Sequence, residues 1–194
     1  MVGWKRRGVL VMTKLIRDNK IALYSAGFMI IMSTWLITCT AELSAYSLIK
    51  FSLLIIFSYA AMVFDISTRK IPNMLVLIML SGWLLLLIPI LFIIPDIGMG
   101  LFLDSLYGML IGGGLFMLVY LLSSKGLGGG DVKFMAVAGL YLGFSNTVPA
   151  ILYGTVLAAL TGTILLIIKK IGRKDAIPLA PFLFIGIMIT VFTP

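Results

Sequence analysis

The chain has 194 residues, of which 61% are hydrophobic and 11% are charged, and its formal net charge is +8. This composition excludes an ordinary soluble domain and predicts an all-α fold, a polytopic helical bundle in a lipid bilayer. The basic residues fall in short clusters between apolar runs, which indicates membrane orientation rather than nucleic-acid binding. With one cysteine and no histidine, the sequence excludes an internal disulfide, a cysteine-based zinc site and catalysis by a histidine base.

The first predicted element is a basic segment followed by a membrane span. Residues 1–20 contain six basic side chains and one acid. Positions 21–40 form an apolar run of the length needed to cross a hydrocarbon core of about 30 Å. We interpret this run as a retained signal anchor whose N-terminus lies in the cytoplasm. Residues 1–45 are thus expected to form an additional N-terminal region beside a membrane domain at 46–194.

Six further spans are predicted within the membrane domain, which gives about seven in total. They lie at 46–64, 71–94, 100–122, 134–147, 150–168 and 177–192. The fifth span of the chain, at 134–147, is short and is expected to be tilted or partly re-entrant. Small residues recur at helical spacing and are expected to let helices pack closely in lipid. These residues are Gly108 and Gly112, Gly139 and Gly143, and Gly154, Ala158 and Gly162.

The distribution of charge predicts the orientation of the bundle. With the N-terminus inside, the segments at 1–20, 65–70, 123–133 and 169–175 are all cytoplasmic. They hold 14 of the 15 basic residues, and the exception is Lys50. This agrees with the excess of lysine and arginine found in the cytoplasmic loops of membrane proteins. The outer loops and helix ends hold the acids Glu42, Asp96 and Asp104.

A polar, glycine-rich segment at 123–133 separates two strongly apolar spans and ends near one acid, Asp131. Its glycines are Gly126, Gly128, Gly129 and Gly130. Irregular backbone at membrane depth is tolerated only where it is buried in protein or lines a wet cavity. An ordinary helix N-cap is the alternative role for Asp131, but a cap does not require a run of glycines. We therefore predict that the glycines at 128–130 form a substrate-access loop beside a functional acid.

A second acid, Asp65, closes the span at 46–64 at the same predicted membrane boundary. The carboxyl end of a helix is an unfavourable place for an anion, and the alternative reading is an interfacial pair with Arg69. Pro72 follows and is suited to opening the next helix. Two carboxylates that share a proton can activate water without a metal or cofactor. We therefore predict that Asp65 and Asp131 form the catalytic pair of a hydrolase.

Four segments in this order and spacing resemble the type IV prepilin peptidases, membrane aspartic proteases of the GxGD class. They are DISTRKIPN at 65–73, GLGGGDVK at 126–133, MAVAGLYLG at 135–143 and IPLAPFLFIG at 177–186. The resemblance runs from about Tyr46 to the C-terminus. It places Asp65 and Asp131 as the catalytic pair. Arg69, Pro72, Asn73 and Lys133 match motif positions and are expected to support the site without being catalytic.

The resemblance implies cleavage of the basic leader of type IV prepilin or pseudopilin precursors. The cut would fall at the cytoplasmic face of a bacterial inner membrane, with these precursors and the lipid bilayer as partners and with no nucleic acid. No metal and no cofactor are expected. Larger members carry a cytoplasmic region with paired cysteine motifs, associated with zinc and with N-methylation of the product. That region is missing from this sequence, so we expect a short form of the family and treat methyltransferase activity as doubtful. The span at 21–40 is expected to be an addition to the peptidase core.

Two alternatives use the same acids. A presenilin-like intramembrane protease would also carry an aspartate pair and a GxGD motif, although the Ile71-Pro72-Asn73 segment and the small size argue against it. A small transporter or channel component would use Asp65 and Asp131 to relay protons or bind a cation. No inverted repeat is evident and few polar residues lie in the span centres, which disfavours transport.

Overall fold

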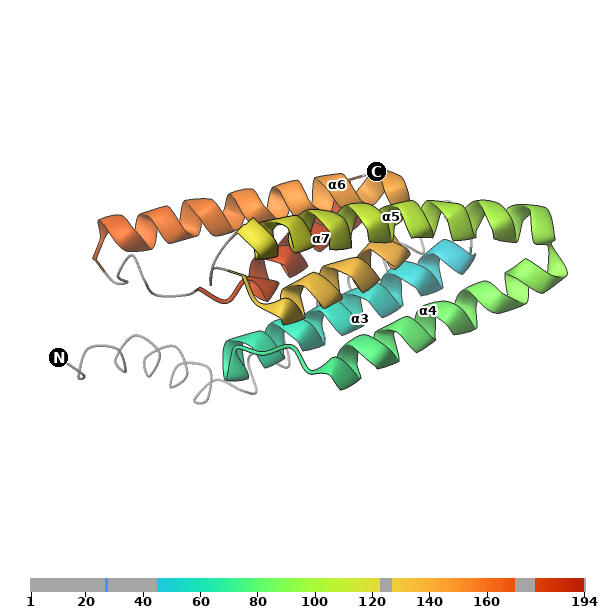
Figure 1. Ribbon diagram of the computed structural model, residues 1–194, viewed down its shortest axis with the longest axis horizontal. Helices are drawn as coiled ribbons and strands as arrows, with labels where there is room; N and C mark the ends of the chain where they lie inside the picture. Colours follow the sequence, from blue (N-terminus) through green and yellow to red (C-terminus); the bar gives the residue numbers. More distant parts are fainter. Residues whose placement is uncertain (1–26, 28–44, 123–126, 170–176, 194) are drawn as a thin grey trace.

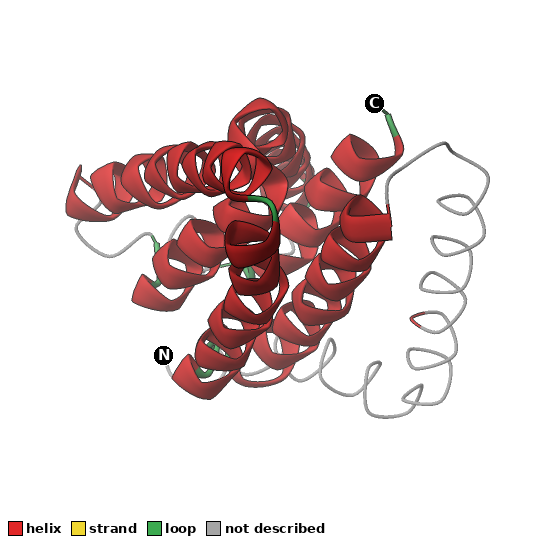
Figure 2. Ribbon diagram, turned by 90° about the vertical axis from the view of Figure 1, so that its right-hand side faces the viewer, coloured by secondary structure: helices red, strands yellow, loops and turns green. Residues whose placement is uncertain are grey.

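The computed structural model describes residues 27, 45–122, 127–169 and 177–193. Within these ranges every regular element is a helix (Figure 2), which confirms the predicted all-α class. The helices are α3 (Ala45–Thr68), α4 (Asn73–Ile93), α5 (Pro95–Leu122), α6 (Gly129–Ile167) and α7 (Ala180–Phe192). The basic N-terminal segment and, apart from Gly27, the predicted span at 21–40 lie outside the described residues.

Four of these helices, α3 to α6, are long and apolar enough to cross a membrane, and α7 is a shorter apolar helix. Large apolar side chains are exposed along them, including Leu85 and Phe92 of α4 and Leu122 of α5. In water such exposure would be costly, whereas lipid tails cover it without penalty. The chain is therefore a multi-pass membrane protein built as a helical bundle.

Helix α6 consists of two parts that meet at a sharp reversal. Gly143 has φ 74° and ψ −176°, which are not helical angles. We name the part at 129–143 α6a and the part at 144–167 α6b; they run in opposite directions (Figure 1). The two predicted spans at 134–147 and 150–168 are thus present, but the break comes earlier than expected. A positive φ is accessible to glycine at little cost, so the chain turns at Gly143.

Helix α6a lies at the centre of the packing. Most side chains of α6a between Phe134 and Leu142 are buried, and the neighbouring helices also contribute buried side chains to this core. The hydroxyl of Tyr141 donates a hydrogen bond of 2.6 Å to the carbonyl oxygen of Met79 in α4. Because Tyr141 is fully buried, this bond satisfies a polar group that has no access to water.

Close contacts between helix backbones confirm the predicted packing role for Gly108, Gly112, Gly139 and Gly154. A methyl group at Gly108 of α5 would overlap the carbonyl oxygens of Gly139 and Gly143 in α6. A methyl group at Gly186 of α7 would likewise overlap the backbone at Ala150 and lie 2.6 Å from the amide nitrogen of Gly154 in α6b. Backbones that approach this closely gain van der Waals contact, which drives helix association in lipid.

The order of the helices brings distant motifs to one end of the bundle. The end of α3, the start of α4, the end of α5 and the start of α6 all lie toward the left of Figure 1. The turn between α4 and α5 lies at the opposite end. Two of the segments predicted to share one membrane face were 65–70 and 123–133, and the first of these lies beside the described part of the second, residues 127–133.

Candidate active site

Asp65 lies in the last turn of α3 and is only 6% exposed. Its Oδ2 accepts a hydrogen bond of 3.0 Å from the backbone N–H of Ala180, the first residue of α7. The carboxylate thus sits at the unfavourable end of its own helix but at the positive end of another. This contact connects the IPLAPFLFIG segment at 177–186 to the candidate site, because Ala180 of that segment supplies the N–H that Asp65 accepts.

Arg69 does not hold Asp65 in the way that the alternative reading proposed. Its backbone N–H donates to the carbonyl oxygen of Asp65 at 2.8 Å, and its own φ is 55°. The helix therefore ends at Arg69, whose side chain is exposed. Across the described ranges these two side chains form no ion pair, although the charge of Arg69 still acts on Asp65 electrostatically.

Asp131 occupies the first turn of α6, and Gly128 is the N-cap. The N–H of Gly128 donates to Asp131 Oδ2 at 3.3 Å, and the N–H of Asp131 donates to the Gly128 carbonyl oxygen at 3.1 Å. The predicted alternative, a helix cap, thus accounts for one carboxylate oxygen. The other, Oδ1, is buried and has no hydrogen-bond partner among the described residues. A buried carboxylate oxygen without a donor is costly and is a feature of functional sites.

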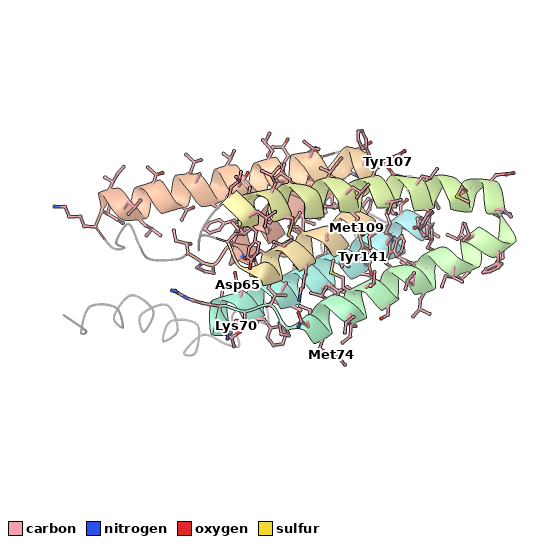
Figure 3. The ribbon with its side chains drawn as sticks, viewed as in Figure 1. Asp65, Lys70, Met74, Tyr107, Met109 and Tyr141 are labelled. Carbon is pink, nitrogen blue, oxygen red and sulfur yellow. The ribbon has the colours of Figure 1, made fainter. Side chains whose placement is uncertain are left out.

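The two acids lie close together at one end of the bundle, although 66 positions separate them in the chain. The charge of Asp65 acts directly on Asp131. Two contacts join the segments around them. Lys133 Nζ donates a hydrogen bond of 3.1 Å to Asn73 Oδ1, and Gly130 packs against Ile71. Figure 3 shows Asp65 and Lys70 at this end, with Tyr141 and Tyr107 farther along the bundle.

The glycines beside Asp131 differ in what they contact. A methyl group at Gly130 would lie 3.3 Å from Ile71 Cβ and 3.4 Å from its backbone nitrogen, a tight fit. A methyl group at Gly128 would lie 3.0 Å from the Asp131 carboxylate, and one at Gly129 would meet nothing within 4 Å. None of the three has a positive φ. Their lack of side chains, and not left-handed backbone, is therefore what the site uses.

Pro72 and Asn73 mark the start of α4 close to the predicted position. Pro72 is the N-cap, with φ −64° and ψ 136°, and Asn73 is the first helical residue. The Pro72 carbonyl oxygen accepts hydrogen bonds from Leu75 and Val76. The predicted span started at 71, two residues too early, because proline here caps the helix instead of occupying its first turn.

One set of contacts could not be found by sequence reasoning. Asp104 was predicted only as an acid near the outer end of a span, but its Oδ1 accepts a hydrogen bond of 2.9 Å from the N–H of Phe144. No sequence motif links these two residues. Within the described ranges, no cluster of three or more His, Cys, Asp or Glu side chains could hold a metal ion.

Comparison with known proteins gives two findings. The model of the type IV leader peptidase family matches residues 52–167, a stretch that includes both Asp65 and Asp131. The prepilin leader peptidase/N-methyltransferase of Bacillus subtilis (strain 168) is 28% identical over 146 residues, which cover 68% of this chain and 59% of the relative. The chain thus spans less than two thirds of the relative's length. No solved structure matches it.

The family match covers more than half of the chain, and it includes the segments whose contacts form the candidate site. The relative matches over a comparable share of the sequence. The chain therefore belongs to the type IV leader peptidase family.

Proposed function

We propose that this protein is a membrane aspartic endopeptidase that removes the leader from type IV prepilin or pseudopilin precursors. One observation carries the proposal. Asp65 and Asp131 come from distant parts of the chain, lie together at one end of the bundle, and leave one buried oxygen of Asp131 without a hydrogen-bond partner among the residues that the structure describes. Carboxylate pairs that share a proton are an established way to hydrolyse peptides without a metal.

The chemistry follows from what the two carboxyl groups can exchange. The ionised member takes a proton from a water molecule while the protonated member donates its own to the carbonyl oxygen of the scissile peptide. The oxygen of the water forms a bond to the carbonyl carbon and gives a tetrahedral intermediate. A proton then passes to the leaving nitrogen, the C–N bond breaks, and the pair again holds one proton.

The backbone orients both acids for this exchange. Asp65 Oδ2 accepts from Ala180 and Asp131 Oδ2 accepts from Gly128. Each carboxylate thus accepts a backbone N–H, and these donors lie at helix N-termini. Such preorganised groups reduce the reorganisation that the reaction requires. Because Gly129 has open space beside it, an extended precursor chain has room to approach Asp131.

We further propose that the site faces the cytoplasm of a bacterial inner membrane. The basic residues described near this end, which include Arg69, Lys70 and Lys133, support that orientation. Residues 46–194 would form the peptidase domain, with 1–45 as an additional region. The name of the relative includes N-methyltransferase, but we limit the proposal to the peptidase. No cofactor is part of the proposed reaction.

The proposal is tested with Asp65→Asn and Asp131→Asn in the full chain, reconstituted in lipid with a prepilin precursor. Asparagine keeps the size and an acceptor oxygen but cannot exchange the proton, so each variant should lose processing by about 10²- to 10⁴-fold. Asp96→Asn, an exposed acid at the opposite end of the bundle, is the matched control. A gel shift of the precursor measures the rate. Near-normal processing by either site variant would refute the assignment.

A further inference from the structure

The reversal at Gly143 begins a new helix at a place where its first N–H groups have no partners in the same helix. The N–H of Phe144 is satisfied from another helix, because Asp104 Oδ1 in α5 accepts it at 2.9 Å. The carbonyl oxygen of Gly143 accepts the hydroxyl of Thr147 at 2.6 Å, and Thr147 is fully buried. Both sides of the turn are thus held by side chains.

The depth of this turn makes those bonds important. Helix α6a has fifteen residues, a length of about 22 Å, whereas the hydrocarbon core is about 30 Å thick. With Asp131 at one membrane boundary, the reversal lies below the opposite surface. A free N–H in hydrocarbon is costly, so irregular backbone there needs a protein acceptor. Asp104 is that acceptor, and a methyl group at Gly143 would overlap its carboxylate.

A basic residue of another helix acts electrostatically on Asp104. Lys50 of α3 is 8% exposed, and its charge interacts with that of Asp104. Lys50 Nζ also lies over two rings, 4.9 Å from the centroid of Phe51 and 5.6 Å from that of Tyr46. This explains why Lys50 departs from the predicted cytoplasmic distribution of basic residues, since it faces the interior of the bundle rather than a loop.

These contacts lie at the end of α6a that is opposite to Asp131. Gly143 lies twelve positions after Asp131, a distance of about 18 Å along one short helix. If the turn slips along the bundle axis, Asp131 moves with it relative to Asp65, because a helix transmits axial displacement. We propose that Asp104 is a positioning residue for the peptidase reaction: it fixes the turn at Gly143 and thereby the height of Asp131. This inference rests on the proposed function.

The test compares Asp104→Asn with Asp104→Leu in the full chain in lipid. Asparagine keeps the acceptor oxygen and leucine keeps the approximate size without one. We expect Asp104→Asn to process a prepilin precursor within about three-fold of the wild type, and Asp104→Leu to lose about 10- to 100-fold in kcat with little change in KM. The split is expected because the misplaced group acts in the reaction and does not bind the precursor.

A second readout does not depend on activity. Asn73 and Lys133 are in contact across the site, so cysteines placed at these positions, with Cys39→Ser, should be joined by a short bifunctional thiol reagent. We expect Asp104→Leu to reduce the yield of this cross-link several-fold and Asp104→Asn to leave it unchanged. Membrane accumulation of each variant is measured alongside, and if Asp104→Leu does not accumulate, Asp104→Ala takes its place, because alanine also lacks an acceptor oxygen.

The outcomes separate the two ideas. Unchanged kcat and cross-linking in Asp104→Leu overturn the positioning role. Equal damage by Asp104→Asn also overturns it, because charge and not the acceptor would then be what matters. If the wild type shows no peptidase activity while cross-linking still depends on the acceptor at 104, the proposed function fails but the structural coupling stands.

Discussion

Asp65 and Asp104 make the same local bond in two regions of the bundle. Each accepts the first backbone N–H of another helix, Ala180 at 3.0 Å for Asp65 and Phe144 at 2.9 Å for Asp104. Their neighbours differ. Asp65 lies beside a second acid, Asp131, whereas Asp104 interacts with the positive charge of Lys50.

The comparison shows that a hydrogen-bond pattern alone does not separate a structural acid from a chemical one. Opposite charges attract each other, so the presence of Lys50 near Asp104 does not require a chemical step at Asp104 to explain it. Two adjacent carboxylates repel each other when both are ionised, and such a pair persists in proteins mainly where chemistry requires it. The neighbouring charge is therefore the more informative signal.

The largest effect on stability is expected at the turn between α6a and α6b, where Gly143 meets Asp104. Gly143→Ala places a side chain at φ 74° and into the Asp104 carboxylate, and should lower the free energy of unfolding by about 2–4 kcal/mol. Gly114→Ala in α5 meets nothing within 4 Å and is the control. Denaturant titration in detergent measures both. Equal stability of the two variants would contradict the account of the turn.

The second effect concerns the charge that balances Asp104. Lys50→Met removes two cation–ring contacts and the opposing charge, and should lower stability by about 1–2 kcal/mol while the rate of processing changes little. Lys70→Met, at an exposed position, is the control for loss of a lysine. If both variants unfold at the same denaturant concentration, Lys50 does not balance Asp104 in the way described.

The smallest effect separates the two roles of Asp65. Asp65→Ala removes the acceptor for the Ala180 N–H and should cost about 1 kcal/mol, as the loss of a helix cap does. Asp65→Asn retains an acceptor oxygen and should be close to the wild type in thermal unfolding, although both variants lose processing. A stable Asp65→Ala protein would show that α7 does not depend on this contact.

Sequence patterns were sufficient for the helical class, for the spans within the described ranges and for the two segments that meet at the site. Apolar run length and the placement of proline and glycine act locally, so they can be read from one stretch of chain. The contact between Lys133 and Asn73 was not predicted as such, although both residues were identified as matching motif positions.

The parts that sequence reasoning missed all depend on contacts between distant helices. The predicted spans at 134–147 and 150–168 put the break in α6 after Thr147, yet the chain turns at Gly143, where α5 supplies Asp104. The donor to Asp65 likewise comes from α7, 115 positions away. Such pairs are set by how the helices pack, and no local pattern encodes them.

The central claim is that Asp65 and Asp131 act as one unit on the precursor. Single-turnover processing by Asp65→Asn, Asp131→Asn and the double variant tests it most directly. For groups that act together, the double variant should be about as slow as the slower single variant. Rate losses that multiply, so that the double variant falls by the product of the two single effects, would show independent roles and contradict the account.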